Sequence, residues 1–142
     1  MPLALRRMLL GLLLLEMIGT EIELLFLRHF EEAWQIVPLG LIALALLILI
    51  WHGVTQTAAS VKVFRAVMIL AFASGFVGLA LHYQGAAEFQ LDIDRTMHGP
   101  TLWLKALQAK APPALAPAVM SHFGLLGLAY TSRHPSLERT AS

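Results

Sequence analysis

The sequence predicts an all-α integral membrane protein, a bundle of four transmembrane helices, and three observations lead to this fold class. Of the 142 residues, 58% are hydrophobic and only 13% are charged, whereas soluble domains are about half apolar and a quarter charged. The mean hydropathy is +0.71. Four stretches approach the roughly 20 mostly apolar residues that a helix needs to cross a hydrocarbon core about 30 Å thick.

The four stretches are residues 8–27, 34–51, 64–83 and 114–130. Lipid offers the backbone no hydrogen-bond partners, so each stretch is expected to be helical. The second stretch is apolar without interruption from Leu39 to Ile50. Pro38, just before this run, suits a first helical turn. Trp34 and Trp51 lie at the two ends of the stretch, as aromatic residues at membrane interfaces do. Because it has no polar residue at depth, we expect it to be the most lipid-exposed helix.

The fourth stretch is preceded by the only sizeable segment outside the membrane. It opens with Pro112, Pro113 and Pro117, but it carries no formal charge and is therefore expected to span. The preceding residues 84–111 form an outer loop. Within it, residues 88–94 alternate polar and apolar, which is typical of an extended strand, and residues 101–110 resemble a short amphipathic helix at the interface.

The whole of residues 1–132 is predicted to form one membrane domain, followed by a short disordered tail, residues 133–142. With the N-terminus inside, the inner segments hold six of the ten cations, and an even number of spans then puts both termini in the cytoplasm. The alternative is a cleaved signal peptide, suggested by Arg6 and Arg7 before an apolar run. No small-x-small cleavage site follows that run, so cleavage is not expected.

The first stretch carries four polar side chains in an otherwise apolar run: Glu16, Thr20, Glu21 and Glu23. At 100° per residue, Glu16, Thr20 and Glu23 fall within an arc of about 60°, whereas Glu21 points away from it. An acidic residue near the middle of a membrane helix costs about 2.5–3.5 kcal/mol on insertion scales. These glutamates are therefore expected to face protein or water, and they are candidates for function.

Depth suggests partners for these glutamates. Counting about 1.5 Å per residue from the inner ends, Glu16, Ser74 and His122 reach a similar depth and could form one polar layer. Small residues four apart, among them Ala71 and Gly75, favour close approach of the third helix to a neighbour. Three interpretations stay open: hydrogen bonds that fix the register of the bundle, a proton or cation relay, and contact with a helix of another subunit.

A metal site is a further hypothesis, with candidate ligands His29, His82, His98 and Glu88. All four fall on the proposed outer side, and imidazole and carboxylate groups bind zinc or copper. Their spacing does not match a specific ligand motif. A haem or pigment held by His52, His82 or His122, or by His29 together with His82, is another alternative.

The composition also excludes several function classes. Without cysteine there are no disulfides, iron–sulfur clusters or thiolate zinc sites, and a net charge of +1 gives no basis for binding nucleic acid. No catalytic motif is present, so an enzyme is not expected.

The sequence therefore favours a non-enzymatic accessory or assembly subunit of a larger membrane complex. Its expected partners are the lipid bilayer and either other membrane subunits or a second copy of the chain. One alternative is a proton- or metal-coupled carrier or sensor that uses Glu16, Glu23 and His122. The other is a haem- or pigment-binding membrane subunit.

Overall fold

A computed structural model describes residues 1–109 and 113–138, and this part of the chain is 81% helix with no strands. The helices are α1 (Leu3–Phe26), α2 (Ala33–Thr55), α3 (Ala58–Ile93), α4 (Gly99–Leu107), α5 (Ala118–Thr131) and α6 (Pro135–Glu138). The all-α prediction is confirmed, and α1, α2, α3 and α5 each overlap one of the four apolar stretches.

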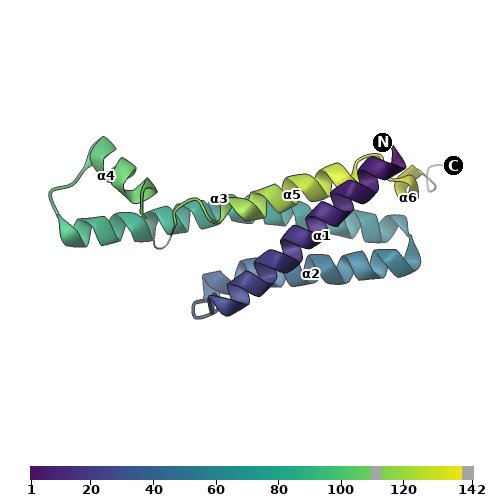
Figure 1. Ribbon diagram of the computed structural model, residues 1–142, viewed down its shortest axis with the longest axis horizontal. Coiled ribbons are helices and arrows are strands. Elements are labelled where there is room, and N and C mark those ends of the chain that lie inside the picture. Colours follow the sequence, from purple (N-terminus) through teal and green to yellow (C-terminus); the bar gives the residue numbers. More distant parts are fainter. Residues whose placement is uncertain (110–112, 139–142) are drawn as a thin grey trace.

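These four helices run up and down in an elongated bundle (Figure 1). The N-terminus, the turn between α2 and α3, and α6 lie at one end of it, which we call the terminal end. The connection between α1 and α2 lies at the other side of the bundle. Helix α3 packs most extensively against α5 and next against α2, while α1 crosses α5 and α2.

The core lies along α3. Its largest fully buried side chains include Leu13 and Met17 of α1, Ile42 of α2, Phe64 of α3 and Phe123 of α5. Because these residues come from all four long helices, one apolar core holds the bundle together.

Glycines allow α3 and α5 to approach closely. A Cβ atom at Gly124 would lie 2.6 Å from the carbonyl oxygen of Met68, and one at Gly75 would lie 2.7 Å from the backbone nitrogen of Ser121. Any side chain larger than hydrogen would therefore push the two backbones apart. The small-residue pattern of the third apolar stretch thus correctly indicated a close helix contact.

Two helices, α2 and α3, are long and apolar enough to cross a membrane. Most of their surface is exposed: Leu47 and Ile50 of α2 are 63% and 65% exposed, and Ile69 and Phe76 of α3 are about half exposed. The core helix of a soluble protein would instead be largely buried. Helix α1 carries Arg6, Arg7 and three glutamates, and α5 has only 14 residues.

Two sequence expectations are wrong. Residues 88–93 are not an extended strand but the last turns of α3, so the outer connection begins only at Asp94. Helix α4 packs on this end of α3, and Ala106 of α4 and Ala86 of α3 are buried. This packing stabilises a helix that the alternation of residues 88–94 alone would not indicate.

The second wrong expectation is the disordered C-terminal tail. Residues 133–138 fold back onto the bundle, where His134 and Ser136 are buried. Residues 139–142 lie outside the described part of the chain. The expectation that α2 is the most lipid-exposed helix stays a prediction; α1 has three buried residues and α2 has five.

Candidate functional site

Two of the three residues of the predicted polar layer, Glu16 of α1 and His122 of α5, come together. His122 Nδ1 lies 3.2 Å from a carboxylate oxygen of Glu16, within ion-pair distance but without the alignment of a hydrogen bond. The pair is open on one side, since the Glu16 side chain is 35% exposed and that of His122 is 53% exposed. It lies near the middle of α1, with the apolar side chains of Leu12 and Leu15 exposed nearby.

Ser74 does not join this pair. Its hydroxyl donates to the Ala71 carbonyl of its own helix at 2.8 Å. The hydroxyl that links α5 to α3 is instead that of Ser121, which donates to the Phe72 carbonyl at 2.9 Å. A Cβ atom at Gly75 would collide with Ser121, so the absence of a side chain at Gly75 gives this contact the space that it needs.

The remaining polar residues of α1 occupy two environments. Thr20 is half-buried and Glu23 is exposed, so the acidic face that contains Glu16 continues outward along the helix. Glu21 is half-buried, and one of its carboxylate oxygens is fully buried without a hydrogen-bond partner. A buried carboxylate oxygen without a donor is unfavourable and indicates that α1 carries more polar character than the bundle satisfies.

The four proposed metal ligands do not gather. In residues 1–109 and 113–138, no group of three or more histidine or acidic side chains is placed to hold a metal ion. His98 Nδ1 donates to the Thr96 carbonyl at 2.7 Å, and Glu88 is exposed on α3.

Only His29 and His82 come together, with ring centroids 6.4 Å apart. His82 Nδ1 also lies 3.0 Å from the Pro113 carbonyl oxygen and donates to it. Burial, and then the nearby His82 charge, lower the pKa of His29. A haem or pigment bound by these rings stays a prediction.

A second polar cluster lies at the terminal end, where α2 meets α3. Helix α2 is capped by Gln56, whose backbone is left-handed (φ 51°), and Thr57 caps α3 by accepting a hydrogen bond from the Ser60 backbone N–H. The Ser60 hydroxyl donates its hydrogen to the Thr57 carbonyl at 2.8 Å. His52 Nδ1, 2.7 Å from the same hydroxyl oxygen, must therefore be the donor in that contact, which leaves Nε2 as an acceptor in the neutral ring.

The chain termini complete this cluster. The ring of His134 lies 4.9 Å from that of His52 and 5.6 Å from that of Tyr130, measured between centroids. Arg6, only 7% exposed, donates from Nη2 to the Arg133 carbonyl at 2.8 Å, which ties α1 to the segment after α5. Its Nη1 is buried and has no hydrogen-bond partner.

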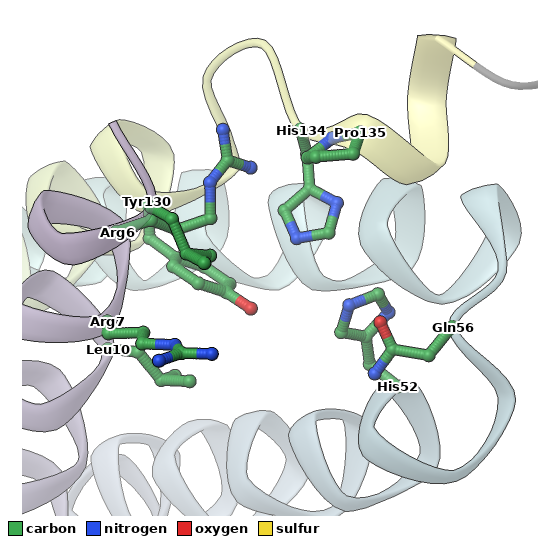
Figure 2. A pocket seen from close by; sticks show the side chains of 9 residues that line it. Arg6, Arg7, Leu10, His52, Gln56, Tyr130, His134 and Pro135 are labelled. Atoms are coloured by element: carbon green, nitrogen blue, oxygen red, sulfur yellow. The ribbon is translucent and has the colours of Figure 1, made fainter. Parts of the chain in front are cut away.

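These side chains line a cavity of about 220 Å³. Figure 2 shows the Tyr130 hydroxyl and the Arg7 guanidinium directed into the same space, with His52, His134 and Gln56 across from them. A second cavity of about 430 Å³ shares His52, Gln56 and Tyr130 with the first and continues along the apolar surfaces of α1 and α2.

Sequence reasoning missed this second cluster. Arg6 and Arg7 were explained by membrane orientation alone, and His134 lies in the tail that was expected to be disordered. The only local signal is the excess of cations, six of the ten, in the three segments assigned to one side of the membrane.

Comparison of the chain with protein-family models, with curated proteins and with solved structures gives no match.

Proposed function

We propose that the chain is a four-span membrane protein with both termini in the cytoplasm, and that it acts as a non-enzymatic accessory or assembly subunit of a larger membrane complex. The spans would be α1, α2, the first two thirds of α3, and α5 with the residues just before it. Helix α5, of 14 residues, measures about 21 Å, and a short span of this kind is accommodated by local thinning of the bilayer.

The exposed apolar surface supports the membrane location. Large apolar side chains are exposed on all four helices, as at Leu15, Leu47, Leu70 and Leu125. In water, exposed apolar surface on this scale would drive aggregation, whereas contact of the same surface with lipid acyl chains is favourable.

The observation that carries the assembly role is the open acidic face of α1. The Glu16–His122 pair is partly exposed, and Glu23 is exposed two turns further along the same face. Contact between an exposed carboxylate within a span and the lipid acyl chains is energetically unfavourable. A polar contact from a helix of another subunit, or of a second copy, would satisfy the carboxylate.

Site-directed photo-cross-linking in native membranes tests this role. A photoreactive residue at Gly19, beside the acidic face, has room because a Cβ there meets nothing within 4 Å. The matched control position is Leu47, 63% exposed on α2. We expect a defined protein adduct from position 19 but not from position 47. The adduct should disappear when Glu16→Gln and Glu23→Gln are combined. No adduct from position 19, or equal adducts from both positions, would refute the proposal.

A proton relay is the second candidate, favoured by the 3.2 Å contact between Glu16 and His122. A carboxylate and an imidazole are the two side-chain types that proton relays within membranes use. In proteoliposomes carrying a pH-sensitive dye, a relay predicts a proton flux that Glu16→Gln abolishes and that Glu31→Gln, outside the spans, leaves unchanged. Flux that is absent, or equal in both variants, removes this candidate.

A further inference from the structure

The two cavities at the terminal end form one amphipathic site. The smaller cavity is lined by Arg6, Arg7, His52, Gln56, Tyr130 and His134, and the larger continues from it between α1 and α2. Beyond the shared residues, the larger cavity is lined by Leu14, Ile18, Leu46, Leu49, Ile50 and Gly53. A chamber that mixes charged and polar side chains with apolar ones, such as Leu3 and Pro135, thus opens into a more apolar groove.

The chamber fits an anion. None of the described residues that line either cavity is acidic, whereas the Arg7 guanidinium is directed into the smaller one (Figure 2). Arg6 is more than nine-tenths buried and its guanidinium is turned towards the segment after α5, so it adds a second positive charge beside the chamber (Figure 2). Guanidinium groups bind phosphate oxygens with directional, charge-assisted hydrogen bonds. The Tyr130 hydroxyl and the Gln56 amide offer further donors (Figure 2).

The groove has the depth of one lipid leaflet. From Arg7 to Ile18, α1 rises about 17 Å, and from Gln56 to Leu46, α2 rises about 15 Å. Half of a 30 Å hydrocarbon core is also about 15 Å. The volume of the groove, about 430 Å³, lies in the range of small-ligand sites.

We propose that this site binds one anionic phospholipid from the leaflet at the terminal end, with its phosphate in the chamber at Arg7 and Tyr130 and an acyl chain in the groove between α1 and α2. The proposal rests on the membrane location proposed above, but not on the assembly role.

Lipid binding to the full chain in mild detergent, measured by native mass spectrometry, tests the site. The probes are dioleoyl phosphatidylglycerol, which is anionic, and dioleoyl phosphatidylcholine, which is zwitterionic. We expect phosphatidylglycerol to bind at least about tenfold more tightly, and Arg7→Gln to weaken it about tenfold or more. Lys62→Gln, an exposed cation at the same end, is the matched control and should have no effect.

The groove is tested separately at Gly53, which lines it and where an added Cβ meets nothing within 4 Å. Gly53→Leu should abolish phosphatidylglycerol binding by filling the groove, whereas Gly40→Leu, equally open on α2 but outside both cavities, should not. The proposal is overturned if the two lipids bind equally, if Arg7→Gln binds like the unmodified chain, or if Gly53→Leu still binds.

Inorganic phosphate distinguishes a soluble ligand from a lipid. If low millimolar phosphate displaces phosphatidylglycerol and Gly53→Leu does not change the binding, the chamber binds a soluble phosphate compound. The proposal of a bound lipid would then be overturned. Resistance of the chain to alkaline extraction from membranes tests the membrane location independently. A negative lipid result can therefore be told apart from a failure of the proposed location.

Discussion

Replacing Gly124 with alanine should weaken the contact between α3 and α5. The new Cβ would lie 2.6 Å from the Met68 carbonyl oxygen, 2.6 Å from the Phe72 Cβ and 2.7 Å from the Phe72 backbone nitrogen. Ordinary contacts are about 3.5–4.0 Å, so the helices must separate by about 1 Å. Two of the three atoms belong to backbone and cannot move alone. Overpacking of this kind costs about 1–3 kcal/mol.

Gly40→Ala is the matched control, because a Cβ there meets nothing within 4 Å. Both substitutions gain the same preference of alanine for the helix, up to about 1 kcal/mol, so this contribution cancels in the comparison. Unfolding in mixed micelles, followed by circular dichroism, should therefore give Gly124→Ala a free energy of unfolding about 1–3 kcal/mol below that of Gly40→Ala. Equal stability of the two variants would refute the close helix approach.

Two further predictions concern the ends of the bundle. Arg6→Gln should release the segment after Arg133, and deuterium uptake there should rise about tenfold or more because a charged hydrogen bond is lost; unchanged uptake would contradict the contact. His82→Gln should raise the pKa of His29, measured by NMR titration, because a nearby positive charge is removed. Since folding lowers this pKa, the contribution of His29 to stability is present above its ordinary value of 6.5 and is lost as the pH falls towards the folded-state pKa. An unchanged His29 pKa would show that the two rings do not interact.

The helices could be predicted because apolar length is a local property of the sequence. The run from Leu39 to Ile50 has no alternative to a helix, and it lies wholly within α2. Depth counting, which needs only the helical rise, placed Glu16 beside His122. The extension of α3 to Ile93 depends on packing against α4, and no pattern within residues 88–94 reveals that contact.

The cluster at the terminal end could not be predicted for a different reason. It joins Arg6 to residues more than 120 positions away in the chain, and the return of the C-terminal segment decides whether His134 is buried or solvated. Charge counting treats an arginine in the same way whether it lies in solvent or in a core. Only the three-dimensional path of the chain separates Arg6, which is buried, from Lys62, which is exposed.

The length of α3 has a consequence for the opposite side of the bilayer. Its 36 residues measure about 54 Å, whereas a membrane with its head groups is about 40–45 Å thick. In the proposed topology the last turns therefore form a stiff extramembrane stalk to which α4 is attached. An antibody fragment or receptor approaching from that compartment would meet α4 and the exposed Phe89 before it reached any lipid.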